Sequence, residues 1–212
     1  QSYLYGKLFI KKTHLNLNIG NKNIKKITKV NLFDKEINFK NVSYAHNGMN
    51  EDILNNIDFK IIKKQKIGIM GESGSGKTTL LNLIMGFLAP KKGEITIDNV
   101  NLKNHLINWQ SLIAYVPQTV AILDDTLKLN ITFESDDDKI DYNKLKQAIK
   151  ISGLDKFILN NNQSYEIIIG EKGSKISGGE ILRVSLARAI YSNAEILILD
   201  EFTSALDNET EE

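Results

Sequence analysis

The glycine-rich segment from Gly71 to Thr79 has the residue types and the spacing needed to bind a phosphate group. Its sequence, GESGSGKTT, fits the pattern G-x-x-x-x-G-K-[ST]. Glycines allow successive backbone N–H groups to point at phosphate oxygens, and a helix that starts there adds its positive end. Lys77 would pair with the β and γ phosphates of a nucleotide, and the Thr78 hydroxyl could ligate Mg²⁺. The candidate nucleotide-binding residues of this segment are Ser73, Gly74, Ser75, Gly76, Lys77, Thr78 and Thr79.

An acidic pair follows an apolar run far downstream. Residues 196–199 read Ile-Leu-Ile-Leu, and Asp200 and Glu201 come directly after them. Such a run predicts a strand buried on both faces, and the carboxyl end of a parallel strand is where ligands bind in α/β folds. Alone, the pattern also fits a strand end that meets solvent. Together with the phosphate loop, it indicates that Asp200 holds Mg²⁺ through water and that Glu201 orients or deprotonates the water that attacks a γ-phosphate.

The pentapeptide Ile176-Ser177-Gly178-Gly179-Glu180 lies between these two motifs and fits two interpretations. Ser177-x-x-Glu180 is a capping box, in which Ser177 caps a helix and Glu180 reaches back to it. Capping alone does not need Gly178 and Gly179, which are poor helix formers. A helix start with two glycines leaves backbone N–H groups exposed for an anion. We therefore predict that this segment both starts a helix and binds a phosphate.

The apolar pattern predicts the elements that position these motifs. Alternating apolar and polar residues predict antiparallel strands, and other apolar runs predict further strands; the predicted strands are 37–39, 57–61, 66–70, 94–97, 112–116 and 194–200. Helical spacing predicts helices at 80–87, before Pro90, at 141–151, capped by Asp141, and at 180–191. The predicted fold class is α/β: a P-loop NTPase core with a mainly parallel sheet, an antiparallel N-terminal β flank and a helical subdomain.

Composition limits the possible functions. Of the 212 residues, 42% are hydrophobic, which is enough to bury a core, and 27 Lys and Arg nearly balance 26 Asp and Glu. That balance gives no reason to expect a nucleic-acid partner. The absence of cysteine excludes thiolate metal sites and disulfides. No apolar stretch approaches the roughly 20 residues of a membrane helix. Residues 1–33 include a run rich in Lys and Asn and are predicted to form a connector.

Five motifs occur in the order and spacing of ATP-binding cassette (ABC) ATPases, over residues 37–207. They are the phosphate loop 71–79, Gln118 after Tyr115-Val116-Pro117, the signature pentapeptide 176–180, the acidic strand 196–201, and Ser204-Ala205-Leu206-Asp207. The chain therefore resembles an ABC nucleotide-binding domain. The resemblance implies that ATP and Mg²⁺ are the cofactors and that two such domains face each other head to tail. Ser177, Gly178 and Gly179 would then bind the γ-phosphate of ATP held by the partner domain.

The same resemblance implies roles for single residues. Gln118 would sense Mg²⁺ and the attacking water, and Asp207 would lie at the dimer interface. The candidate catalytic residues are Glu201, Gln118 and Lys77. The candidate metal ligands are Thr78, Gln118 and Asp200. In relatives, an aromatic side chain stacks on adenine at the position of His46; the imidazole can stack there, and a surface loop histidine is the alternative, with Tyr44 expected in the core.

Two further segments resemble ABC exporters in particular. Residues 170–173, Gly-Glu-Lys-Gly, resemble a loop that touches the membrane domain in exporters, and residues 123–131 also resemble exporters. With Trp109, the chain is similar to flippases of lipid-linked oligosaccharides. The implied partners are a second ABC domain and a transmembrane domain, upstream in the same protein, at the cytoplasmic face of a membrane. The expected layout is a connector at 1–33 and an ABC ATPase domain at 34–212, with its core at 34–117 and 181–212 and a helical subdomain at 118–180.

The chain departs from the family pattern at several points. Glu180 replaces the usual Gln, Phe202 replaces the usual Ala, and the switch histidine that follows Asp207 in relatives is missing, since no histidine follows His105. We therefore expect a C-terminally incomplete domain that binds ATP with little or no turnover. Two other classes stay open: a soluble ABC ATPase that acts on DNA or ribosomes, and a non-catalytic nucleotide-binding regulatory module. The compact, near-neutral composition disfavours the first. The missing C-terminal end favours the second, but intact Lys77, Asp200 and Glu201 oppose it.

Overall fold

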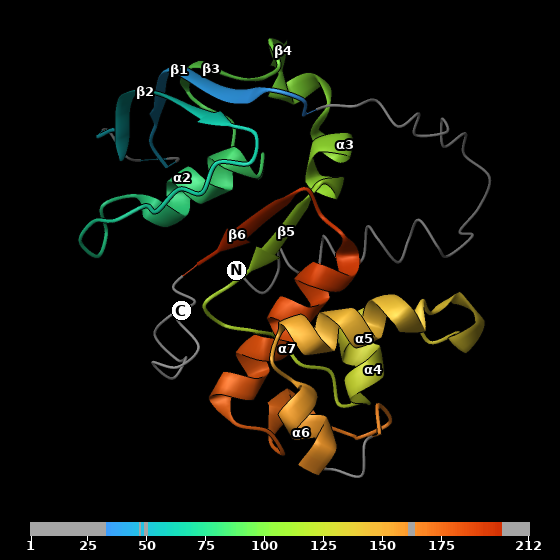
Figure 1. The fold of residues 1–212 in the computed structure, drawn as a ribbon. Helices are drawn as coiled ribbons and strands as arrows, with labels where there is room; N and C mark the ends of the chain where they lie inside the picture. Colours follow the sequence, from blue (N-terminus) through green and yellow to red (C-terminus); the bar gives the residue numbers. More distant parts are fainter. Residues whose placement is uncertain (1–32, 47, 49–50, 161–163, 201–212) are drawn as a thin grey trace, which may run out of the picture.

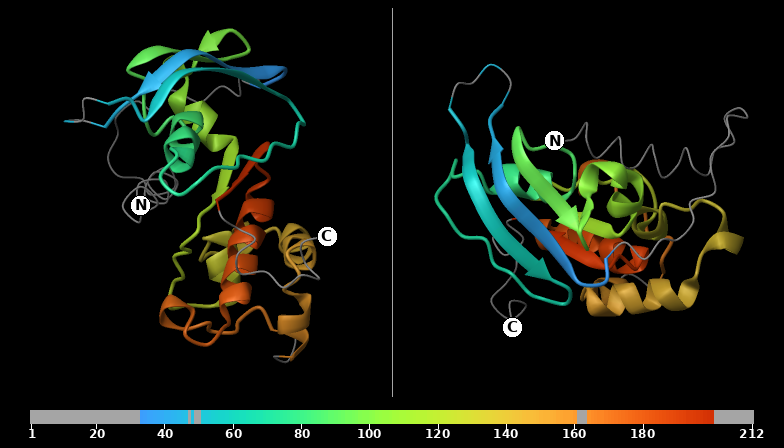
Figure 2. Two further views of the ribbon diagram at one scale, coloured as in Figure 1. Left: turned by 90° about the vertical axis from the view of Figure 1, so that its left-hand side faces the viewer. Right: turned by 90° about the horizontal axis from the view of Figure 1, so that it is seen from above.

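The computed structural model describes residues 33–46, 48, 51–160 and 164–200. Figure 1 shows a β-rich part with helices α2 and α3 at the top, a helical part at the bottom, and the strands β5 and β6 between them. Figure 2 shows the same arrangement from two further sides. Among the described residues, no helix combines the length and the apolar character needed to cross a bilayer.

The β-rich part is built on a four-stranded sheet in the order β2-β1-β3-β4. Its strands are β1 (Glu36–Tyr44), β2 (Leu54–Ile62), β3 (Lys92–Ile97) and β4 (Val100–Asn101). All neighbouring pairs are antiparallel. Phe39 of β1 lies opposite Phe59 of β2, and their rings stack with centroids 4.3 Å apart. The predicted antiparallel flank is therefore confirmed, and a cross-strand aromatic pair stabilises it.

Helix α2 (Lys77–Ile84) and helix α3 (Leu106–Ser111) pack against this sheet. A short 3-10 turn, η1 (Leu102–Asn104), leads into α3. The α2 side chains Leu81, Leu83 and Ile84 are buried in one core with the strands. Trp109 of α3 is fully buried there, and its indole Nε1 donates a hydrogen bond to the Ile84 carbonyl at 2.7 Å. The core thus fixes the helix that begins at the phosphate loop.

The strands β5 (Ile113–Val116) and β6 (Ile196–Leu199) form a separate parallel pair, although the chain between them is long. Because the four described strands of the larger sheet are antiparallel, the predicted mainly parallel sheet is not confirmed for the described residues. The prediction that the last strand is buried on both faces is wrong. Leu197 and Leu199 are 50% and 43% exposed, because they point away from the core that receives Ile198.

The predicted strand at residues 66–70 is also wrong. This segment has no strand assignment, and Ile67 and Met70 are 46% and 95% exposed. Alternating apolar residues give a segment the tendency to be a strand, but a strand also needs a neighbour for its backbone hydrogen bonds. Within the described part of the chain, none of the strand pairings includes these residues.

The helical part contains α4 (Leu127–Thr132), α5 (Tyr142–Ile151), α6 (Asp155–Asn160) and α7 (Gly178–Ser192), with 3-10 turns η2 (Asp137–Lys139) and η3 (Glu171–Gly173). Its own core includes the predicted inner face of α5: Leu145, Ala148 and Ile149. The Asp141 carboxylate accepts a hydrogen bond from the Lys144 backbone N–H at 3.0 Å, so the predicted cap is confirmed. Helix α7 also contacts the parallel pair, where Ala189 packs with Val116.

Candidate nucleotide-binding site

The predicted phosphate loop is a tight turn that leads directly into α2. Gly74 and Gly76 have φ angles of 82° and 91°, in the left-handed region that favours glycine. Gly76 is the residue before α2, no side chain caps the helix there, and its first turn carries no acidic residue. The start of α2 therefore presents backbone N–H groups and the positive end of the helix dipole, which suit an anion.

Lys77 folds over its own loop. Its Nζ donates hydrogen bonds to the carbonyls of Gly71 and Glu72, at 2.7 and 2.8 Å. The ammonium group thus already lies above the loop rather than in open solvent. The neighbouring Thr78 is exposed, whereas Thr79 is buried against the core. Of these two threonines, Thr78, the predicted metal ligand, is therefore the one exposed to solvent.

Asp200 and Gln118 follow neighbouring strands at the same edge of the parallel pair. Val116 of β5 lies opposite Leu199 of β6, and the Asp200 backbone N–H donates to the Val116 carbonyl at 2.9 Å. Asp200 directly follows the last residue of β6, and Gln118 lies two residues after the last residue of β5. In Figure 1 the carboxyl end of β6 and the loop before α2 lie on the same side of the molecule. Glu201 lies outside the described residues.

Tyr115 is the residue at this edge that sequence reasoning missed as a participant. Its phenol donates a hydrogen bond to Asp200 Oδ2 at 2.8 Å. Burial raises the pKa of the Tyr115 phenol well above its ordinary value, and the bond to the Asp200 carboxylate raises it further. The phenol is therefore a hydrogen-bond donor at any physiological pH. The sequence shows only a tyrosine three residues before Gln118. Its contact with Asp200 depends on the register between β5 and β6, which are far apart in the sequence.

The signature pentapeptide forms the start of α7 as predicted. Ser177 Oγ accepts from the Glu180 N–H at 3.3 Å, and the Glu180 carboxylate accepts from the Ser177 N–H at 2.7 Å, so the capping box is complete. An added Cβ at Gly178 would meet no atom within 4 Å. The space beside this helix start is therefore open, and Ser177 and Gly178 are exposed, with Gly179 half-buried.

The start of α7 lies far from the phosphate loop within this chain. Figure 1 and the left view of Figure 2 share a vertical axis, and in both the start of α7 lies at the lower end of the molecule while α2 lies in the upper part. The structure thus brings Asp200 and Gln118 to one strand edge, but it does not bring Ser177, Gly178 and Gly179 to the phosphate loop.

His46 lies just after β1 and is exposed. Its Nδ1 is 3.2 Å from the hydroxyl of Tyr44, and the two rings meet edge to face at 5.3 Å between centroids. Tyr44 is buried, as predicted for a core residue. The imidazole is thus exposed and contacts Tyr44 through Nδ1, and stacking of adenine on this ring stays a prediction.

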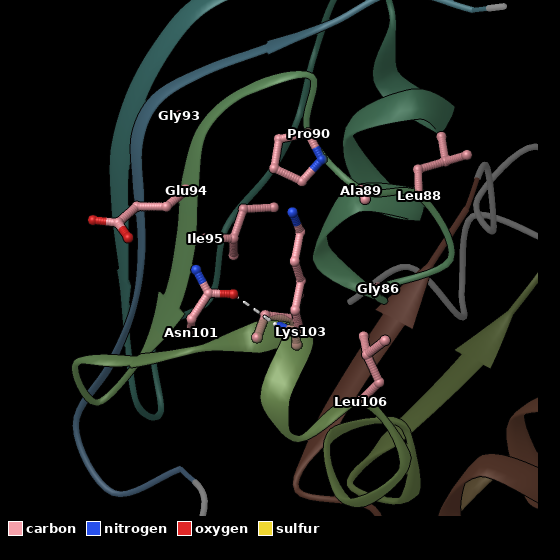
Figure 3. A pocket seen from close by; sticks show the side chains of 11 residues that line it. Gly86, Leu88, Ala89, Pro90, Gly93, Glu94, Ile95, Asn101, Lys103 and Leu106 are labelled. Atoms are coloured by element: carbon pink, nitrogen blue, oxygen red, sulfur yellow. Dashed lines mark hydrogen bonds between the residues drawn. The ribbon is translucent and has the colours of Figure 1, made fainter.

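A separate pocket lies between the end of α2 and the segment from β3 to α3 (Figure 3). Its lining is mainly apolar and includes Leu88, Pro90, Ile95 and Leu106, with Lys103 reaching across it. None of the predicted site residues lines this pocket. It is therefore distinct from the candidate nucleotide site.

The oxygen donors at the strand edge fit Mg²⁺, which prefers hard oxygen ligands and keeps several waters. Gln118 and Asp200 lie at this edge, and Thr78 lies in the first turn of α2; each of the three side chains carries an oxygen that could ligate the ion. In the described part of the chain, no three His, Cys, Asp or Glu side chains form a metal cluster. The donor set suits an ion held jointly by a few protein oxygens, water and a nucleotide, rather than an all-protein cage.

Comparison with known proteins identifies the family. A profile described as "ABC transporter" matches residues 54–204. The chain is 40% identical over 177 residues to the "ATP-dependent lipid A-core flippase" of Haemophilus influenzae, covering 83% of this chain and 30% of the relative. It is 41% identical over 180 residues to a "putative export ATP-binding/permease protein" of Rickettsia bellii, with 83% and 30% covered.

A solved structure, titled "Structure of a bacterial Atm1-family ABC exporter with ATP bound", matches with a TM-score of 0.78 and 29% identity. The match covers 94% of this chain and 34% of that one. The chain belongs to the ABC transporter family. The resemblance predicted from the motifs is confirmed, and this chain spans about a third of the length of these relatives.

Proposed function

We propose that this chain is the ATPase domain of an ABC exporter, in which binding and hydrolysis of ATP drive transport across a membrane. The observation that carries the proposal is the separation of the two predicted phosphate-binding segments within one chain, the loop before α2 and the start of α7. One nucleotide cannot contact both surfaces of the same chain. Two chains in head-to-tail contact would pair each loop with the α7 start of the other, so each ATP would lie between two subunits.

In this proposal, each residue has a role that follows from its place. Lys77 would move from the Gly71 and Glu72 carbonyls to the β and γ phosphates, whose oxygens carry more charge than a carbonyl. His46 would stack on adenine. Residues 73–79 would hold the phosphates through backbone N–H groups and hydroxyls. The open helix start at Ser177, Gly178 and Gly179 would bind the γ-phosphate of the partner's ATP.

The chemistry at the strand edge would be hydrolysis. Bound Mg²⁺ would neutralise charge on the phosphates, and Thr78, Gln118 and Asp200 are the residues that would hold it. Glu201 would orient the attacking water and accept its proton, with Gln118 close to both. These assignments are supported by the motif spacing and by the position of Asp200 and Gln118 at one edge.

The partners follow from the family. We propose a second ABC domain as the dimer partner and a transmembrane domain in the same protein, with residues 34–212 as the ATPase domain at the cytoplasmic face of the membrane. Residues 1–33 would connect the two domains. The relatives named as flippases and export permeases support an exporter, and nothing in the charge balance favours a nucleic-acid partner.

The test is the loss of nucleotide binding when Lys77 is replaced. Lys77→Ala removes the ammonium group that folds over the phosphate loop, and we expect ATP affinity to fall at least about a hundredfold, the equivalent of roughly 3 kcal/mol. A fluorescent ATP analogue displaced by ATP measures this directly. Lys146→Ala, at an exposed lysine of α5, is the matched control and should bind like the unmodified chain. Equal affinity of Lys77→Ala and the control would refute the nucleotide site.

A further inference from the structure

The strand register places Tyr115 and Asp200 on the same face of the parallel pair. Tyr115 lies opposite Ile198, and Asp200 is two residues beyond Ile198, directly after the end of β6. Since side chains alternate along a strand, residues two apart share a face, and two residues rise about 6.6 Å. A tyrosine side chain spans that diagonal, and its hydroxyl lies 2.8 Å from Asp200 Oδ2.

Both ends of this contact are fixed by their surroundings. The ring of Tyr115 packs against the core that contains Ile198, so it cannot turn freely. The backbone of Asp200 is tied to β5 through its N–H, which donates to the Val116 carbonyl at 2.9 Å. The hydrogen bond from Tyr115 therefore restrains the remaining freedom of Asp200, the rotation of its carboxylate. Oδ2 accepts from the phenol, and Oδ1 is the oxygen left to point elsewhere.

We propose that Tyr115 is a positioning residue for the metal site: its hydroxyl holds the Asp200 carboxylate in the orientation that receives Mg²⁺ with ATP. This inference rests on the proposed function, because it assumes that Asp200 acts on Mg²⁺. It adds a residue to the site that does not itself touch the metal or the nucleotide. A ligand held in place in advance loses less freedom when the metal binds, so the complex is tighter. A purely packing role for Tyr115 would need the ring but not the hydroxyl.

The variant that separates these roles is Tyr115→Phe, which keeps the ring and removes only the donor. The measurement is ATP affinity with Mg²⁺ and with EDTA, by displacement of a fluorescent nucleotide from the whole chain. The ratio of the two affinities reports how strongly the metal supports nucleotide binding. We expect this ratio to fall about ten- to a hundredfold in Tyr115→Phe, as for loss of one hydrogen bond to a charged group, while affinity in EDTA stays unchanged. Tyr191→Phe removes a hydroxyl that accepts from the Asp141 N–H in the helical part, and it should change neither value.

A double-mutant cycle tests whether Tyr115 acts through Asp200. In the Asp200→Asn background, where the carboxylate is gone, adding Tyr115→Phe should not lower the ratio of the ATP affinities with Mg²⁺ and with EDTA any further. An equal loss of affinity with and without Mg²⁺, or the same effect of Tyr115→Phe in both backgrounds, would overturn the inference. Those outcomes would leave the proposed function standing as long as the unmodified chain binds ATP more tightly with Mg²⁺. Failure of the unmodified chain to bind ATP would instead refute the proposed function itself.

Discussion

Replacing Glu180 by glutamine should strengthen ATP-dependent association of two chains while it weakens the start of α7. One oxygen of the Glu180 carboxylate accepts hydrogen bonds from the Ser177 N–H at 2.7 Å and from Ser177 Oγ at 2.9 Å. The negative charge therefore lies beside the hydroxyl that, in the proposed dimer, faces the γ-phosphate of the partner's ATP. A glutamine keeps the size and the accepting oxygen but removes the charge.

The magnitude follows from this geometry. In the dimer the single Ser177 hydroxyl proton would turn from the carboxylate to a phosphate oxygen. That oxygen would lie roughly 5 Å from the carboxylate, since Ser177 Oγ is about 2.8 Å from each and the two directions meet at an angle. Two unit charges at about 5 Å repel by about 1 kcal/mol in water and about 3 kcal/mol at an effective dielectric constant of about 20. Glu180 is half-buried, and a closed interface would exclude only part of the water. We therefore expect a gain of about 1.5 kcal/mol at each of the two sites, which together lower the dimer dissociation constant roughly a hundredfold.

The same change should cost stability in the isolated chain. A carboxylate at a helix start gains from the helix dipole and from the charged cap, so its loss should lower the free energy of unfolding by about 0.5–1 kcal/mol. Urea unfolding measures that effect. Opposite signs for association and stability distinguish this reasoning from a general loosening of the fold, which would weaken both.

The assay for association is sedimentation with Mg-ATP in a Glu201→Gln background, where slowed hydrolysis should retain the dimer. Glu94→Gln serves as the control, because Glu94 is an exposed glutamate of β3 in the other part of the fold. Unchanged or weaker association of Glu180→Gln relative to this control would refute the argument. The carboxylate would then either face away from the phosphate in the dimer or bind something there.

Two further predictions concern the fold that holds the site. Trp109→Phe removes a buried donor to the Ile84 carbonyl, and we expect urea unfolding to show a loss of about 2 kcal/mol from the unpaired carbonyl and the lost ring volume; an unchanged midpoint would contradict this. Burial raises the pKa of Asp98, but hydrogen bonds from the backbone N–H groups of Asp34, Glu36 and Lys35 outweigh it and hold the pKa below its ordinary value. Since the folded pKa is depressed, the stability it contributes is present above about pH 4 and is lost as pH falls through the folded value. Asp98→Asn, which suits the left-handed φ of 48° there, should therefore destabilise the fold at pH 7 and less so at pH 3; an equal effect at both pH values would contradict the assignment.

Features set by neighbours in sequence could be predicted from the sequence. The Asp141 cap and the Ser177 capping box involve residues three apart, and both are confirmed. The left-handed glycines of the phosphate loop are equally local. These features need no partner from another part of the chain, so residue type and spacing decide them.

Several features that depend on distant partners were wrong or missed, although the antiparallel flank was predicted correctly. Residues 66–70 have the pattern of a strand, but the described strands offer them no neighbour. The exposure of Leu197 depends on what covers the outer face of β6, which the apolar run itself cannot specify. The bond from Tyr115 to Asp200 joins residues 85 positions apart, and only the register of β5 and β6 creates it. The predicted roles of the site residues remain predictions until nucleotide binding is measured.

Helix α7 has a mechanical consequence for a dimer built on these two surfaces. Its 15 residues form a rod of about 22 Å at about 1.5 Å per residue. The rod starts just after Ser177 and leads, after a short link, into β6, which Asp200 directly follows. In each subunit, one stiff segment would thus join the nucleotide of the neighbour to the subunit's own nucleotide. Tightening at one end would displace the other, so the two ATP sites of the dimer would respond to each other through the covalent chain.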